Sequence, residues 1–327
     1  MHIPDNYLSP ATCAVMGAVM IPIWSRAIKK VRKEVSRKKM PLMGIGASLS
    51  FLTMMFNIPL PGGTTGHAVG GTLIAILLGP EAACISVTAA LLFQAVLFGD
   101  GGILAFGANS FNMAFVIPFA GYYIYKLLNT KIKSEKGQYI STFIAAYLAM
   151  NLAALCASVE FGLQPLLFKD ASGMPMYCPY PLYISIPAML IPHLLAAGIL
   201  EGVITVGVVA FVRKVSPELM YEGTKINFRP MYALIILLIL LCPLGLIAAG
   251  TAWGEWGNDE IKAVTTGGKA LGFIPKGMRH GFSFEALMAD YSVKGLPAGL
   301  GYVLSAIAAV AVFMLIFRIA ASMRKKS

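Results

Sequence analysis

The chain has 327 residues, of which 57% are hydrophobic and only 13% are charged, and its mean hydropathy is +0.74. A water-soluble domain of this length would not tolerate that composition, so we predict a polytopic membrane protein surrounded by a lipid bilayer. The formal net charge of +11 does not indicate a nucleic-acid partner, because the basic residues lie beside apolar segments, as membrane topology requires.

The first element is the amino terminus. The chain begins Met1-His2 without the cationic and apolar regions of a signal peptide, so we expect Met1 to carry the mature α-amino group. The Met1 amine, the His2 amide nitrogen and the His2 Nδ1 could chelate a metal through fused five- and six-membered rings. One further imidazole would complete a square of nitrogens, which suits Ni²⁺ or Cu²⁺ rather than Zn²⁺. His67 is the candidate for that fourth donor, and a disordered terminus is the alternative.

Apolar segments predict the membrane topology. The first, at residues 11–28, begins after Ser9 and Pro10, which are suited to the N-cap and N1 positions of a helix. A cluster of eight basic residues follows, and the positive-inside rule places it in the cytoplasm and Met1 outside. Eight more apolar segments are predicted at about residues 40–60, 68–78, 82–98, 108–128, 139–159, 182–211, 231–250 and 298–319. With nine spans, N-out and C-in, the other basic clusters also fall inside.

These segments divide into two blocks. We predict an all-α polytopic membrane protein in which residues 1–215 form a seven-span helical bundle for metal capture. Residues 216–230 are a cytoplasmic linker, and residues 231–327 are a two-span hairpin with a large external loop, which we interpret as an accessory domain.

Polar residues near the predicted external face are candidates for supporting the metal ligands. Thr64 and Thr65 precede His67, and we expect their hydroxyls to hydrogen-bond the ligands. Asn109 and Asn112 lie one helical turn apart and are expected to brace the His67 loop through their amides.

Two ionisable residues lie within the seventh apolar segment. His193 and Glu201 are eight residues apart on one helical face. Ionisable groups at membrane depth usually face a cavity or a partner, so these two are either structural hydrogen-bonding groups or a transit or coupling site for the metal.

The chain shows no signature of catalysis. It contains neither the G-x-x-x-x-G-K-[ST] pattern of a P-loop nor the H-E-x-x-H pattern of a zinc hydrolase. We therefore predict a transport protein that is not an enzyme.

Four spaced motifs resemble the CbiM/NikM family, the substrate-capture components of nickel and cobalt energy-coupling-factor importers. They are Met-His-Ile-Pro-Asp at the start, Pro-Gly-Gly-Thr-Thr-Gly-His-Ala-Val-Gly-Gly from Pro61, Leu-Phe-Gly-Asp-Gly-Gly from Leu97, and Gly-Ala-Asn-Ser-Phe-Asn-Met-Ala from Gly107. The resemblance covers roughly residues 1–215, and the tail resembles a fused accessory domain of the CbiN/NikN or PDGLE type. Asn6 stands where the family commonly has glycine, and both residues accept a left-handed backbone.

The resemblance implies a function. Ni²⁺ or Co²⁺ would be the transported substrate, held by the Met1 amine, the His2 amide and imidazole nitrogens, and the His67 imidazole. A transmembrane coupling subunit and cytoplasmic ATPase subunits would be the partners, in a bacterial or archaeal cytoplasmic membrane. The choice between nickel and cobalt stays open, with planarity favouring nickel. A stand-alone secondary divalent-metal transporter is the alternative, and for it only Glu201 is a fair candidate as a midplane carboxylate.

Overall fold

The computed structural model describes residues 1–37, 39–60, 63–132, 134–219, 227–248, 250–266 and 269–323. Several positions used in the predictions lie outside these residues. They are part of the linker 216–230, the terminal basic cluster 324–326, and Lys38, Pro61, Gly62 and Lys133.

The described chain is mostly helical, which confirms the predicted all-α class. Its α-helices are α1 (Pro10–Glu34), α2 (Met40–Met55), α3 (Gly71–Leu78), α4 (Pro80–Phe93), α5 (Phe106–Asn109), α6 (Ile117–Lys131), α7 (Glu135–Leu167), α8 (Leu182–Pro192), α9 (Gly198–Val215), α10 (Arg229–Leu241), α11 (Asn258–Ile261), α12 (Lys276–Arg279) and α13 (Ala298–Met323). The π-helical stretches are η1 (Gln94–Phe98), η2 (Ser110–Val116) and η3 (His193–Ala197), and the 3₁₀ stretches are η4 (Pro217–Leu219), η5 (Cys242–Ile247) and η6 (Ala289–Tyr291). The strands form two small hairpins, β1 (Ile58–Leu60) with β2 (Thr64–Gly66) and β3 (Thr265–Thr266) with β4 (Lys269–Ala270).

Six described helical stretches are long and apolar enough to cross a bilayer. They are Pro10–Glu34, Pro80–Phe98, Glu135–Leu167, Leu182–Val215, Arg229–Ile247 and Ala298–Met323. The apolar segments at 40–60 and 68–78 contain the shorter helices α2 and α3, and the count of nine spans and the N-out orientation stay predictions.

The predicted second span is too long. Helix α2 ends at Met55, and Ile58–Leu60 turns into the first strand of a hairpin. Pro59 explains the change, because it has no amide hydrogen to donate and disfavours a helical backbone at the preceding residue. The hairpin ends at Gly66 and leads directly into His67.

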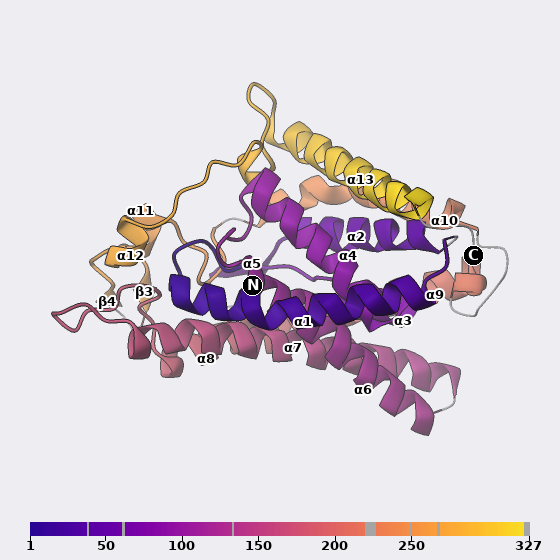
Figure 1. Ribbon diagram of the computed structural model, residues 1–327, viewed down its shortest axis with the longest axis horizontal. Helices are drawn as coiled ribbons and strands as arrows, with labels where there is room; N and C mark the ends of the chain where they lie inside the picture. The colour runs from indigo at the N-terminus through magenta and orange to yellow at the C-terminus, as the bar shows by residue number, and fades with distance from the viewer. Residues whose placement is uncertain are drawn as a thin grey trace.

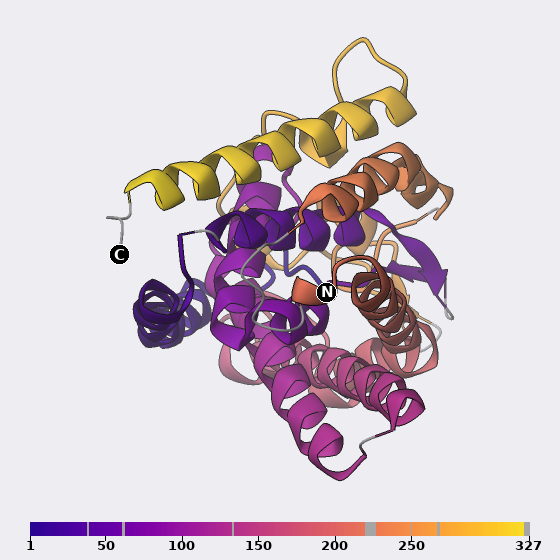
Figure 2. The same cartoon turned by 90° about the vertical axis from the view of Figure 1, so that its right-hand side faces the viewer.

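Helix α2 is the centre of the bundle. All of its residues from Leu42 to Met55 are buried, so it is apolar on every side rather than on one face. It packs against α4 on one side and against α10 and α13 on the other. In the end-on view of Figure 2, α13 and α10 lie on one side of α2, while α6 and α7 form the opposite side of the bundle.

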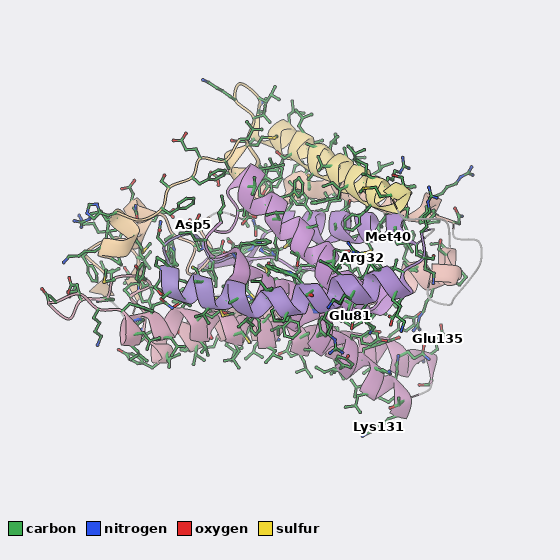
Figure 3. The ribbon with its side chains drawn as sticks, viewed as in Figure 1. Asp5, Arg32, Met40, Glu81, Lys131 and Glu135 are labelled. Carbon is green, nitrogen blue, oxygen red and sulfur yellow. The ribbon has the colours of Figure 1, made fainter. Side chains whose placement is uncertain are left out.

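The two ends of the bundle differ in what they carry. Asp5 lies toward one end, whereas Arg32, Met40, Lys131 and Glu135 lie toward the other (Figure 3). The short elements α11, α12 and the β3–β4 hairpin of the long loop before α13 cluster at the Asp5 end (Figure 1). The long loop before α13 and Asp5 are therefore at the same end of the bundle.

Candidate metal centre

The amino terminus is folded into the bundle. Met1, His2 and Ile3 are all buried, with exposed fractions of 5% or less. Asn109, the last residue of α5, pairs with the main chain of Ile3 in both directions. Its Oδ1 accepts from the Ile3 amide at 2.7 Å, and its Nδ2 donates to the Ile3 carbonyl at 3.0 Å. The Gly102 amide also donates to that carbonyl, at 2.8 Å. The terminus is thus a buried segment held by hydrogen bonds at Ile3, which contradicts the disordered alternative.

The turn after this segment is fixed from two sides. The Asp5 carboxylate accepts hydrogen bonds from the amides of Ile103 and Leu104, at 3.0 and 2.7 Å. Asn6 has a φ of 68°, which confirms the left-handed backbone expected at this position. Its side chain also exchanges hydrogen bonds with the Phe282 main chain, at 2.8 and 2.9 Å, and the long loop before α13 thereby holds the turn.

The two predicted imidazole ligands meet. His67 Nε2 lies 3.2 Å from His2 Nδ1, the ring centroids are 4.9 Å apart, and both side chains are buried. Two nitrogens bound at right angles to one metal ion through bonds of about 2.0 Å would lie about 2.8 Å apart. The observed spacing is close to that value.

The hydrogen-bond partners of the rings decide which nitrogens hold lone pairs. His67 Nδ1 lies 3.1 Å from the Ala68 carbonyl oxygen, which can only accept, so Nδ1 carries the proton and Nε2 the lone pair. His2 Nε2 lies 3.3 Å from Gln94 Oε1. The Gln94 amide is oriented with its oxygen toward His2, because its Nε2 donates to the Asp100 carboxylate at 3.1 Å. His2 Nδ1, however, faces two acceptors, the lone pair of His67 Nε2 and the carboxylate oxygen Asp100 Oδ1, each at 3.2 Å, so it is placed to donate a hydrogen to them. A metal ion bound by both rings would take the place of that hydrogen.

Burial keeps His67 in the neutral form that a metal requires. Loss of solvation lowers the pKa of His67 well below its ordinary value, and the neighbouring His2, the Met1 amine and His193 lower it further. A neutral imidazole beside a backbone carbonyl is the usual arrangement of a metal-binding histidine.

The α-amine has a partner that sequence analysis missed. The Met1 nitrogen lies 3.0 Å from Glu255 Oε1, and Glu255 comes from the long loop before α13. Trp253, two residues earlier, donates its amide to Thr64 Oγ1 at 2.7 Å. The motif Trp-Gly-Glu-Trp in this loop was the available signal, but nothing in the sequence pairs it with residue 1.

A second group from the same region reaches His2 through Asp100. Asp100 Oδ1 lies 3.2 Å from His2 Nδ1, and the Tyr291 hydroxyl donates to the other carboxylate oxygen of Asp100. Tyr291 also accepts from Gln94 Nε2 at 2.9 Å, and its ring stacks on Phe98. The left-handed φ of 57° at Tyr291 is unusual for an aromatic residue and is held in place by these contacts. Asp100 lies in the Leu-Phe-Gly-Asp-Gly-Gly motif, one of the four that carry the family resemblance.

The predicted supporting residues have other partners than expected. Asn109 braces the amino-terminal segment, not the His67 loop, because α5 brings its amide against Ile3. Asn112 donates to Glu160 Oε2 on α7 at 2.9 Å. Thr64 accepts from the Trp253 amide instead of bonding a ligand, and Thr65 is buried behind it in the hairpin.

Glu201 takes over the role assigned to the asparagines. Its carboxylate is completely buried and accepts from the Val69 amide at 2.7 Å and the Gly70 amide at 3.0 Å. Gly70 has a φ of 72° and caps α3, so Glu201 on α9 anchors the short segment that follows His67. His193 has a different partner, since its Nδ1 is bonded to the Met189 carbonyl at 2.7 Å.

Side chains alone do not form a conventional metal site in the described part of the chain. It contains no group of three or more His, Cys, Asp or Glu side chains placed to hold an ion. A metal centre at His2 and His67 therefore needs nitrogens of the main chain. The Met1 amine and the His2 amide are the adjacent ones, and this donor set fits a planar ion.

Comparisons with known proteins identify the family of the chain. Residues 2–219 match the family described as the cobalt uptake substrate-specific transmembrane region, and residues 229–326 match the PDGLE domain. A probable fused nickel transport protein, LarMN of Lactiplantibacillus plantarum, is 53% identical over 97% of both chains. The fused nickel transport protein NikMN of Rhodobacter capsulatus is 43% identical over 99% of this chain and 98% of its own. A crystal structure described as a truncated transition metal transporter is 56% identical with a TM-score of 0.62, and it covers 65% of this chain and 99% of its own.

Proposed function

Because the chain belongs to the family of cobalt uptake substrate-specific transmembrane regions, we propose that it captures Ni²⁺ or Co²⁺ outside the membrane for delivery inward. The ligands are the Met1 amine, the His2 amide nitrogen and Nδ1, and His67 Nε2. The observation that carries this assignment is the 3.2 Å approach of two buried imidazole nitrogens, His2 Nδ1 and His67 Nε2. The nickel named for two full-length relatives supports the class of substrate.

The donor set favours nickel over the other candidate ions. Three of the four nitrogens belong to two consecutive residues, so the fused chelate rings keep them nearly coplanar. Planar nitrogen fields suit Ni²⁺, whereas Zn²⁺ prefers a tetrahedron. The same donors bind Co²⁺ less tightly by the Irving–Williams order, which makes cobalt the second substrate of the site.

Energy for uptake has to come from other subunits in this proposal. The sequence has no P-loop, so the partners are a transmembrane coupling subunit and cytoplasmic ATPase subunits, in a bacterial or archaeal cytoplasmic membrane. The chain itself is then a transport component, N-out and C-in, without enzymatic activity. Residues 1–215 form the metal-capture domain, residues 216–230 the cytoplasmic linker and residues 231–327 the accessory domain. The gap between the two family matches supports this division.

The contacts of Glu201 count against a stand-alone secondary transporter. Such a transporter would need a carboxylate free to bind the ion or a proton near the midplane. Both oxygens of Glu201 accept hydrogen bonds from backbone amides. Uptake into vesicles that requires ATP and the co-expressed partners is expected, and partner-free uptake driven by a proton gradient would favour the alternative.

The chelate is tested by moving the amine. An additional methionine placed before Met1 leaves every side chain in the sequence but shifts the α-amine by one residue, beyond the reach of the chelate rings. We expect nickel affinity to fall at least about 100-fold, since one strong donor is lost and the planar set is broken. The yellow-orange colour of a square nickel complex should vanish with it.

A matched insertion keeps this test specific. The same methionine inserted between Lys294 and Gly295, two exposed loop residues, should leave nickel affinity unchanged. Mass spectrometry must show Met1 present and unacylated in the parent protein. Equal nickel affinity of the extended and parent proteins would overturn the role of the amine.

A further inference from the structure

The long loop before α13 contains a short apolar segment at residues 282–288. In Figure 1 it is part of the orange trace that leads from α12 to the start of α13. Phe282, Phe284 and Leu287 have exposed fractions of 41%, 48% and 82%. Single exposed apolar residues are common, but three large ones this close together form a patch that marks contact with another molecule.

Both ends of segment 282–288 are tied to the folded chain. The main chain of Phe282 exchanges hydrogen bonds of 2.8 and 2.9 Å with the Asn6 side chain. At the other end, the Met288 amide donates to the Leu97 carbonyl at 2.9 Å. Leu97 belongs to η1, the last part of the apolar stretch Pro80–Phe98 that is long enough to cross a bilayer. The segment therefore lies where a spanning helix ends.

Its apolar patch continues the surface of that helix. Phe282 and Phe284 line a cleft together with Ala95 and Ile103, among other residues. Ala95 lies inside the spanning stretch, about one turn before its end. The next residue, Val96, has an exposed fraction of 39%. An exposed apolar side chain on a spanning helix faces lipid, so the patch on the loop borders a surface that lipid already covers.

The backbone of the segment decides how deep it can lie. The amides of residues 283–286 donate no hydrogen bond to the part of the chain that the structure describes. Unpaired backbone groups are not tolerated within hydrocarbon, and Ser283 and Glu285 also need water. At the headgroup level the backbone can be hydrated while the apolar side chains reach the acyl chains, about 5–10 Å into the boundary.

We propose that segment 282–288 is an interfacial membrane anchor, whose Phe282, Phe284 and Leu287 side chains insert among the phospholipids of the leaflet at the Asp5 end of the bundle. The contact is made with the acyl chains, so it does not select a headgroup charge. The lipid holds the segment, and the segment holds the turn at Asn6 through Phe282. This anchor does not depend on the metal that the chain transports.

Tryptophan at the patch measures its depth. Phe284→Trp and Leu287→Trp each place an indole in the segment, and Ala171→Trp places one in an exposed turn beside the ion pair of Asp170 with Lys276. The full chain is reconstituted in nanodiscs of phosphatidylcholine that carries bromine either near the carbonyl end or near the methyl end of its chains. Bromine quenches an indole that it contacts. Subtracting the emission of the parent protein removes the contribution of its three native tryptophans.

An interfacial anchor gives a distinctive pattern of quenching. Bromine near the carbonyl end should remove most of the emission that the tryptophan adds at position 284 or 287. Bromine near the methyl end should remove much less. The emission maximum of both variants should lie at shorter wavelength than that of Ala171→Trp, which neither lipid should quench.

Hydrogen exchange in the same nanodiscs tests whether the lipid holds the segment. The double variant Phe284→Ser with Leu287→Ser should speed exchange of the Phe282 amide by about tenfold or more, since burial of one large apolar side chain shifts an equilibrium by at least that factor. Met174→Ser removes an apolar side chain of similar exposure, 43%, from the turn after α7 and is the matched control. Its Phe282 amide should exchange as in the parent protein.

Four outcomes overturn the proposal. Emission of both patch tryptophans as solvent-exposed indoles, without quenching by either lipid, would place the segment in water. Stronger quenching from the methyl end would place it in the bilayer centre, where its unpaired amides are not tolerated. Absence of quenching in a protein that forms a dimer in size-exclusion chromatography would assign the patch to a second copy of the chain. Equal acceleration of exchange in the double variant and in Met174→Ser would reflect general loosening instead of a lost anchor.

Discussion

Replacing Glu201 by glutamine should weaken nickel binding, although Glu201 is not a ligand. The carboxylate accepts hydrogen bonds from the Val69 and Gly70 amides and so fixes the two residues that follow Ala68. Glutamine keeps one acceptor oxygen. At the position of Oε2 that oxygen still accepts from both amides, but the NH₂ group then lies against the Gly70 N–H, from which Oε1 accepts at 3.0 Å in the parent protein. The hydrogen bond to Oε1 is lost and two donors face each other, which weakens the anchor of the segment that follows His67.

The size of the effect follows from the lost bond. A hydrogen bond to a charged group contributes about 1.5–3 kcal/mol. The weaker anchor makes conformations in which His67 is turned away from His2 more populated. The fraction of protein that can bind nickel falls, and the apparent nickel affinity falls by the same factor. At 1.4 kcal/mol for each factor of ten, we expect nickel to bind about 10-fold to 100-fold more weakly.

A second buried carboxylate provides the control. Glu160 on α7 is also buried, and it accepts from Asn112 Nδ2 at 2.9 Å, a bond that glutamine can keep. Nickel titration of Glu201→Gln and Glu160→Gln in detergent, with thermal unfolding of each metal-free protein, separates anchoring from general stability. Equal affinity of Glu201→Gln and the parent protein would refute the anchoring argument. Equal weakening of both variants would assign the effect to the fold rather than to the His67 segment.

Two further predictions concern the surroundings of the chelate. Nickel affinity should fall from pH 8 to pH 5, because protons compete for the amine and the amide nitrogen. His67 should contribute little to the fall above pH 6.5: burial depresses its pKa, so its imidazole becomes protonated only at lower pH. Titration at several pH values checks this, and a constant affinity would contradict the chelate. Tyr291→Phe removes the hydroxyl that donates to Asp100 but keeps the ring, so nickel should bind about fivefold more weakly, equivalent to about 1 kcal/mol. Isothermal titration measures it, and an unchanged affinity would show that the C-terminal region does not support His2.

Much of the fold could be predicted from local patterns. Each of the nine predicted apolar segments contains a helix, and Ser9 caps α1 through a hydrogen bond from the Thr12 amide at 3.0 Å. Hydrophobic composition and helix capping depend on residues that are close together in the sequence, so helix positions can be predicted from the sequence directly. The end of α2 was misjudged because an apolar run does not distinguish the last turn of a helix from a buried hairpin strand.

The candidate ligands could also be predicted, for a related reason. Met1 and His2 are consecutive, and their chelating geometry comes from covalent bond lengths rather than from folding. His67 had to be chosen from a small set, since the chain has only four histidines, and its glycine-rich loop favoured it. The approach of the two rings to 3.2 Å is a result of tertiary packing.

The partners of the polar residues could not be predicted. Burying a polar side chain in an apolar helix costs free energy, and the sequence shows such side chains at Gln94, Asn109 and Glu201. Each of them has many geometrically allowed partners. Helix packing selects one of them, as when α5 places Asn109 against Ile3 and not against the hairpin.

The sequence by itself determined the class of protein, the positions of the helices and the chelating pair at the terminus, because these depend on composition and on covalent neighbours. Tertiary structure alone decided that Glu255 meets the Met1 amine across 254 positions and that Tyr291 reaches His2 through Asp100. A hydrogen bond depends on distances of a few tenths of an ångström between groups that only the packed bundle brings together.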